Sequence, residues 1–131
     1  MKFYSWVAVG SGAAAGAWLR WQLGICLNAV VPALPLGTLA SNLVAGFLIG
    51  VCIELFMQYA SIPTEVRLFL VTGFLGGLST FSTFSAEVVT LLQTRAYAWA
   101  FSTAALHLFG SLVLTFAGIY VARVMMGSHA L

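Results

Sequence analysis

Hydroxyl side chains and aromatic rings alternate in one short segment of the chain, TFSTFS at residues 80–85. At 100° per residue of helix, these side chains point in directions that cover nearly the whole circumference. Phe81 and Phe84 are three residues apart and share one face. Aromatic rings carry positive edges, so rings beside hydroxyl donors attract an anion without a fixed positive charge that would hold it too tightly. The spacing favours an anion pathway, and plain core packing is the alternative for the two rings.

Polar or small residues also recur every four positions in two other apolar segments. The first set is Thr38, Asn42, Gly46, Gly50 and Glu54, and the second is Thr103, His107, Ser111 and Thr115. A four-residue period keeps each set near one face of a helix. Because polar groups inside a bilayer must face partners or water, two long polar faces indicate more than helix packing alone.

Single members of these faces also have ordinary structural explanations. Small residues mediate close helix packing, which is the preferred interpretation for the pair Gly12 and Gly16, for Gly50 and for Thr103. His107 taken alone is more commonly a hydrogen-bonded interior histidine than a proton carrier. Asn42 differs because the donors of its amide need acceptors, which favours a functional role.

Three glycines, Gly73, Gly76 and Gly77, come just before the hydroxyl segment. Each lowers helix propensity by about 1 kcal/mol relative to alanine, so this helix is predicted to break at its Gly-rich middle. An unwound turn would free backbone carbonyls that a cation could satisfy. Close helix packing is the alternative explanation for the glycines.

The composition restricts the class of protein. Of the 131 residues, 62% are hydrophobic and 6% are charged, and the mean hydropathy is +1.06. A soluble domain carries about a quarter charged residues, so we expect an all-α integral membrane protein with one domain, residues 1–131. The net charge of +2 without a Lys/Arg run argues against a nucleic-acid partner. Cys26 and Cys52 stand alone and predict no metal site.

Four transmembrane helices are predicted from the apolar runs, at residues 3–27, 37–57, 66–92 and 98–125. Short connections with prolines separate the first three, so both termini should lie on one side. Lys2, Arg67 and Arg123 then flank that side, and Arg20 and Arg95 the other. With three positive charges on one side and two on the other, the positive-inside rule favours neither orientation strongly. Such a balance would permit insertion in both orientations and an antiparallel dimer.

Four sequence motifs resemble those of the Fluc (CrcB) fluoride channels. They are GAWLRW at residues 16–21, GTLASNLVAGFLIG at 37–50, TGFLGGLSTFSTFSAE at 72–87 and GSLVLT at 110–115. The resemblance covers all four predicted spans. It implies an antiparallel, dual-topology homodimer in the bacterial cytoplasmic (inner) membrane, multi-pass, with passive fluoride efflux that lowers cytoplasmic fluoride toxicity.

The resemblance also implies roles for particular residues. Phe81 and Phe84 would line the fluoride pore, with Asn42 as the pore amide. The polar track beside the ion path would consist of Ser82, Thr83, Ser85, Ser111 and Thr115. Arg20 would lie in an aqueous vestibule, and backbone carbonyls of Gly76 and Ser79 would bind a structural sodium ion that is not transported. Thr103 stands where some relatives carry tyrosine, and the roles of Thr103, His107 and Glu87 stay open.

Two other functions compete with a channel. A small dual-topology, proton-coupled exporter of organic cations needs a membrane-buried carboxylate, but the first span has none, and Glu54 and Glu87 are better explained as structural or interface carboxylates. A non-transporting membrane assembly protein would leave the polar circumference of residues 80–85 unexplained. An enzyme is not expected, because the sequence offers no nucleophile–base set, metal cluster or phosphate loop.

Overall fold

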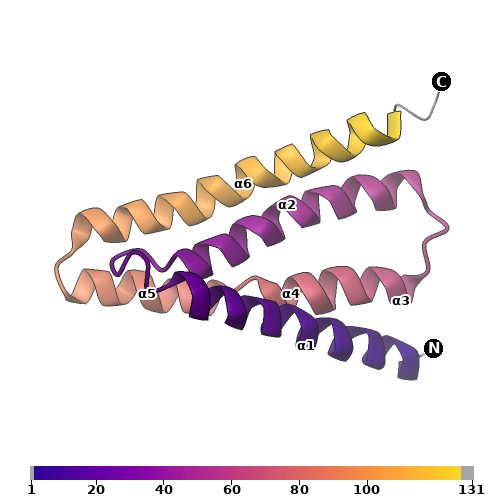
Figure 1. Cartoon of the computed structure of the whole chain (residues 1–131). Coiled ribbons are helices and arrows are strands. Elements are labelled where there is room, and N and C mark those ends of the chain that lie inside the picture. Colours follow the sequence, from indigo (N-terminus) through magenta and orange to yellow (C-terminus); the bar gives the residue numbers. More distant parts are fainter. Residues whose placement is uncertain (1, 128–131) are drawn as a thin grey trace.

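The computed structural model describes residues 2–127, which form long helices joined by short loops (Figure 1). The helices are α1 (Lys2–Leu27), α2 (Leu36–Gln58), α3 (Thr64–Arg67), the π-helical η1 (Leu68–Leu75), α4 (Gly76–Leu78), α5 (Phe81–Gln93) and α6 (Tyr97–Gly127). The segments α3, η1 and α4 run on from one another, and α5 follows after two extended residues. No strand occurs in the described part of the chain, so the all-α expectation is confirmed.

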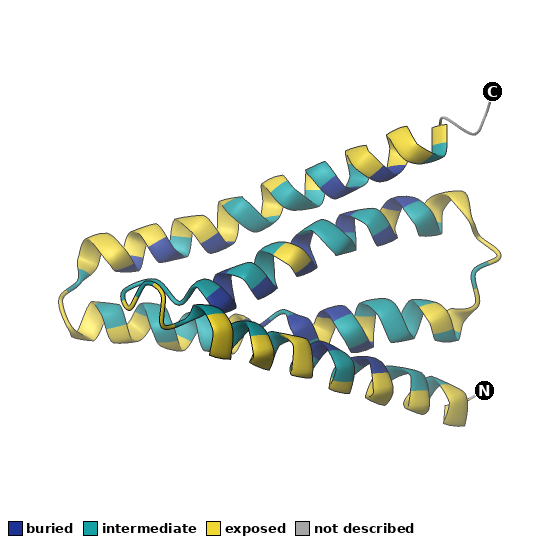
Figure 2. Ribbon diagram, in the orientation of Figure 1, coloured by how far each residue is buried: buried dark blue, intermediate teal, exposed yellow. Residues whose placement is uncertain are grey.

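The helices have the dimensions and composition of a multi-pass membrane protein. Three segments are long and apolar enough to cross a bilayer: α2, the run from Thr64 to Gln93, and α6. The 26-residue α1 has the length as well, but Arg20 and Gln22 make its second half less apolar, and its crossing stays a prediction. Exposed residues dominate the outer faces of α1 and α6 (Figure 2). Many of them are large and apolar, as contact with lipid requires.

Glycines bring the helices together in two closely packed pairs. A Cβ on Gly12 or Gly16 of α1 would overlap backbone atoms of η1, including the Phe69 and Phe74 carbonyls. In the second pair, a Cβ on Gly50 of α2 would overlap a backbone carbonyl of α6 in the same way. The packing roles predicted for these three glycines are therefore confirmed.

The third helical segment is interrupted after its glycines. Gly76 has helical angles (φ −63°, ψ −36°), whereas Ser79 (φ −76°, ψ 154°) and Thr80 (φ −151°, ψ 112°) are extended. The break thus differs from the Gly-rich position expected. In a continuous helix the Thr80 N–H would donate to the Gly76 carbonyl, but here it donates to Oδ1 of Asn42 at 2.7 Å. A side chain of α2, rather than glycine propensity, sets where the helix stops.

The start of α1 and the end of α6 lie at the same end of the molecule (Figure 1), as four antiparallel rods require. Side chains fasten the helix ends there. Nη2 of Arg123 on α6 lies 3.0 Å from Oε2 of Glu54 on α2. The guanidinium of Arg67 donates to carbonyls of the α2–α3 loop and lies 4.8 Å from the ring centre of Phe56. At the opposite end, Oδ1 of Asn28 accepts two N–H groups from the first turn of α2.

Candidate functional site

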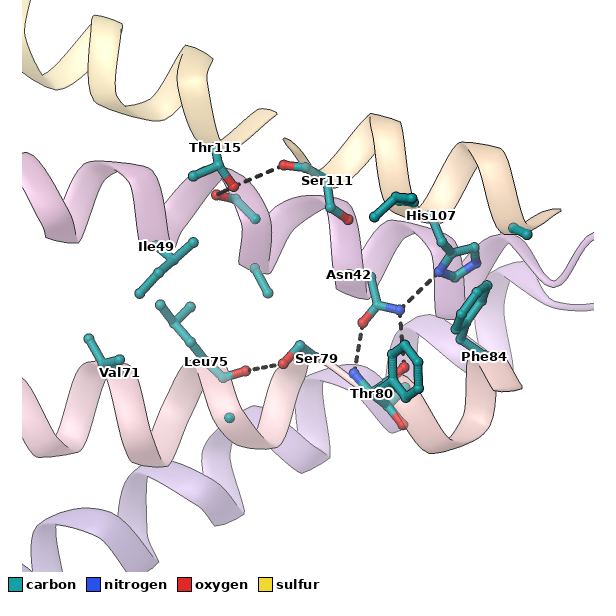
Figure 3. A pocket seen from close by; sticks show the side chains of 16 residues that line it. Asn42, Ile49, Val71, Leu75, Ser79, Thr80, Phe84, His107, Ser111 and Thr115 are labelled. Atoms are coloured by element: carbon teal, nitrogen blue, oxygen red, sulfur yellow. Dashed lines mark hydrogen bonds between the residues drawn. The ribbon is translucent and has the colours of Figure 1, made fainter. Parts of the chain in front are cut away.

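A cavity of about 640 Å³ lies beside the break in the third helical segment. Its walls come from α2, η1, α4, the start of α5 and the middle of α6 (Figure 3). The polar and aromatic lining residues are Asn42, Ser79, Thr80, Phe81, Phe84, His107, Ser111 and Thr115. Among the described residues, no Asp, Glu, Lys or Arg lines this cavity. It therefore offers ring edges and neutral donors without a full charge.

Asn42 joins three helices at the wall of the cavity. Its Oδ1 accepts from the Thr80 N–H, and its Nδ2 donates to the Thr80 carbonyl at 3.1 Å. The same Nδ2 lies 3.0 Å from Nδ1 of His107 on α6. Figure 3 shows the amide between the extended residue and the imidazole. The side chain thus replaces the backbone partners that Thr80 lost when the helix stopped.

Thr80 also caps the helix that starts at the cavity. Its Oγ1 accepts from the Thr83 N–H at 3.2 Å, as an N-cap does, and it lies 2.9 Å from Oγ1 of Thr83 and 3.3 Å from Oγ of Ser82. Helix α5 therefore begins at the cavity wall. Free N–H groups and the positive end of the helix dipole favour negative charge there.

Three rings form a ladder along one side of the cavity. The ring centres of Phe81 and Phe84 are 5.4 Å apart with planes inclined at 60°, and those of Phe84 and His107 are 4.7 Å apart at 31°. Phe81 is 78% exposed in the single chain, whereas His107 is buried. The ladder leads from the surface of the chain into its interior.

On α6, the two hydroxyl residues predicted for the polar track differ in availability. Oγ1 of Thr115 lies 2.9 Å from the Gly46 carbonyl and 2.9 Å from the Ser111 carbonyl, so its only proton is engaged by backbone. The Ser111 hydroxyl lines the cavity and has no hydrogen-bond partner among the described residues. Thr115 thus links α2 to α6, and Ser111 keeps a free donor.

A second cavity of about 340 Å³ shares Thr80 with the first and is also lined by Arg20, Thr38 and Thr83 among others. Nε of Arg20 donates to the Gly77 carbonyl at 3.0 Å, which a continuous helix would have used itself. Thr38 donates to Oε1 of Glu87 at 2.6 Å. The Arg20 guanidinium is therefore held at the break through its Nε, and the residue also lines the smaller cavity.

The structure brings most of the predicted site residues to these two cavities. Asn42, Phe81, Phe84, Ser111 and Thr115 line the larger cavity together with Gly76 and Ser79, and Arg20 and Thr83 line the smaller one. Ser82 contacts Thr80, while Ser85 lines neither cavity. Sequence reasoning missed Thr80 as the residue shared by both cavities. Its signal was a threonine three residues before Thr83, the spacing of a helix cap.

A family model described as CrcB-like protein, Camphor Resistance (CrcB), matches residues 7–119. A protein of Nitrosospira multiformis is 57% identical over 123 residues, which is 94% of this chain and 96% of that protein. One of Cupriavidus metallidurans is 57% identical, with 91% and 94% covered, and one of Burkholderia pseudomallei is 54% identical, with 92% and 94% covered. All three are named fluoride-specific ion channel FluC.

Proposed function

The chain belongs to the CrcB family, and we propose that it is a fluoride-selective channel for passive fluoride efflux across the bacterial inner membrane. The observation that carries the choice of fluoride is its identity above 50%, over nine-tenths of its length, to proteins named fluoride-specific ion channels. The uncharged cavity with its ring ladder supports conduction, because weak neutral donors let an anion enter and leave. A family of channels rather than enzymes also agrees with the expected absence of catalysis.

The two cavities suggest a path for the ion. Arg20 in the smaller cavity would attract the anion from water, and Thr83 would receive it. Thr80 borders both cavities, so the ion would pass the start of α5 and reach the rings of Phe81 and Phe84. Ser111, which lines the larger cavity, would add a hydroxyl donor along this path. Ser82 and Ser85 line neither cavity, and their place beside the path stays a prediction.

A second, oppositely inserted copy would complete the pore. Phe81 is 78% exposed in the single chain, and Gly76 has no neighbour closer to its Cβ position than 3.7 Å. If a single chain lay in the bilayer without a partner, Asn42, Ser79 and Ser111 in the cavity would face hydrocarbon, which is unfavourable for polar groups. The near balance of arginine and lysine between the two ends supports an antiparallel dimer.

The break also suits a structural sodium ion. In a continuous helix, the carbonyls of Gly76 and Ser79 would accept from the N–H groups of Thr80 and Thr83, but those groups donate to Asn42 and to the Thr80 hydroxyl. Two carbonyl oxygens on one cavity wall are thus left for a cation, as in broken transmembrane helices. The ion would neutralise these dipoles at the centre of the dimer. No cluster of His, Cys, Asp or Glu able to hold a metal occurs between residues 2 and 127.

The carboxylates do not favour the rival exporter. Glu54 is paired with Arg123. Oε1 of Glu87 accepts from Thr38, while its buried Oε2 has no partner among the described residues. Neither glutamate lines the larger cavity, where an exporter of organic cations would need a proton-binding group.

Purified protein in liposomes loaded with potassium fluoride tests the function. We expect rapid fluoride efflux once valinomycin lets potassium follow, little efflux without valinomycin, and much slower loss of chloride from matched vesicles. A fluoride electrode measures the rates, and protein-free vesicles are the control. Chloride loss as fast as fluoride loss would contradict selectivity, and fluoride exchange that needs a proton gradient instead of valinomycin would favour coupled transport.

Dual insertion is tested by labelling two loops in cells. Single cysteines replace Ser61, between α2 and α3, or Thr94, between α5 and α6, in a background without Cys26 and Cys52. Because the loops lie at opposite ends, we expect an impermeant maleimide to label a part of each population from outside and the rest after permeabilisation. Complete labelling of one loop with none of the other would show a single orientation.

A further inference from the structure

The orientation of the Asn42 amide is fixed by the backbone of one residue. The Thr80 N–H can only donate and the Thr80 carbonyl can only accept, so they assign Oδ1 and Nδ2 of Asn42 without ambiguity. One Nδ2 hydrogen goes to the Thr80 carbonyl, and the other points to His107 at 3.0 Å. Both donors of the amide are therefore used inside the protein.

This assignment decides where His107 carries its proton. Nδ2 of Asn42 has no lone pair to offer, so Nδ1 of His107 must accept the hydrogen bond. The ring is then neutral, with its hydrogen on Nε2, because a hydrogen on Nδ1 would face the amide hydrogen. Asn42 thus acts as a positioning residue for the tautomer of His107.

The Nε2–H group is a buried donor without a partner. His107 is 5% exposed, and its Nε2 makes no hydrogen bond to any described residue. One helical turn earlier on α6, Thr103 is 0% exposed and its Oγ1 is also unpaired. Figure 3 shows the imidazole next to the Asn42 amide and above the Phe84 ring, with its second nitrogen on the side away from Asn42. Each of these two buried polar atoms lacks a hydrogen-bond partner, which costs free energy, and a small hydrogen-bonding guest would supply one.

We propose that Nε2–H of His107, with the hydroxyl of Thr103, is a donor site for the fluoride ion beside Phe84. The proposal rests on the proposed function. It assigns the hydrogen-bond donor that is free to bind the ion to Nε2 of His107, because both hydrogens of the Asn42 amide are already used. Fluoride accepts hydrogen bonds strongly and is small enough to lie against a ring edge next to an N–H group. Because the imidazole is neutral, it would bind fluoride less tightly than a full positive charge would, and conduction requires that the ion can leave.

Three variants separate the parts of the site in the liposome assay. His107→Asn keeps an acceptor near the Nδ1 position but lacks a donor at Nε2, so fluoride efflux should fall at least about ten-fold, as expected for one lost hydrogen bond to a charged group. His107→Gln places an amide N–H near the Nε2 position and should lose less than His107→Asn. The isosteric Thr103→Val should also lower efflux. Equal rates for His107→Asn and the parent would overturn the proposal.

Nitrogen-15 NMR of the histidine-labelled dimer in detergent gives an independent readout. The His107 signals are those missing from His107→Asn. We expect Nδ1 unprotonated and Nε2 protonated, and a shift of the Nε2–H signal with sodium fluoride but not with equal sodium chloride. A proton on Nδ1, or an Nε2–H signal that fluoride leaves unmoved, would overturn the proposal even if the parent conducts fluoride. If the unmodified protein transported no fluoride, the proposed function would be wrong. The NMR experiment with sodium fluoride would still decide whether Nε2–H of His107 binds the ion.

Discussion

Phe81→Ile is expected to reduce fluoride efflux from liposomes to the level of protein-free vesicles. The substitution keeps an apolar side chain of moderate size but removes the ring edge at the outer end of the ladder, 5.4 Å from Phe84. An aliphatic side chain has no positive ring edge. The ion would therefore lose the contact with residue 81 that follows Thr83 and Thr80 on the proposed path. The measurement is the initial rate at a fluoride electrode with valinomycin present.

Phe109→Ile is the matched control. Phe109 is 62% exposed on α6 and lines neither cavity, so the same exchange there should leave efflux close to the parent rate. Both variants should elute as the parent does in size-exclusion chromatography. Parent-like efflux through a folded Phe81→Ile protein would remove the ring from the conduction path, and equal losses in both variants would show a general sensitivity to ring removal.

Local patterns in the sequence were sufficient for the helices and for several of the polar and aromatic residues that line the larger cavity. The apolar runs predict helices whose observed bounds lie within about two residues of the expected ranges, because length and apolarity are properties of each segment alone. The four-residue period placed Asn42 and His107 on faces that do meet. The glycines at 12, 16 and 50 pack as expected, since close approach leaves no room for a Cβ.

The features that escaped prediction depend on contacts distant in the sequence. The helix stops at Ser79 and Thr80 because Asn42, 38 residues earlier, takes the Thr80 N–H. Helix propensity placed the break at the glycines, because propensity depends only on the local sequence and not on contacts with distant residues. The hydroxyl of Thr115 is likewise engaged by the carbonyl of Gly46, 69 residues away. Which polar groups stay free for an ion is decided by such pairings, and residue type alone does not reveal them.

Gly16→Ala is expected to destabilise the protein more than its size suggests. The new Cβ would overlap the Phe74 carbonyl and lie 2.7 Å from the Leu78 nitrogen, so α1 must move away from η1 and α4. Overpacking of this kind costs about 1–3 kcal/mol. Leu78 is 0% exposed and comes just before the break, so the shift should also disturb the Thr80–Asn42 pairing. We therefore expect a lower melting temperature in detergent, measured by circular dichroism, together with slower fluoride efflux.

Gly10→Ala provides the same chemical change on the same helix without the contact. A Cβ on Gly10 meets nothing within 4 Å, and alanine favours a helix over glycine by roughly 0.5–1 kcal/mol, so this variant should melt at or slightly above the parent temperature. If the two variants melted alike, the tight α1–η1 contact would not stabilise the fold. A Gly16→Ala protein that melts early yet conducts at the parent rate would separate helix packing from the geometry of the break. The two would then be independent, although Leu78 joins them in the chain.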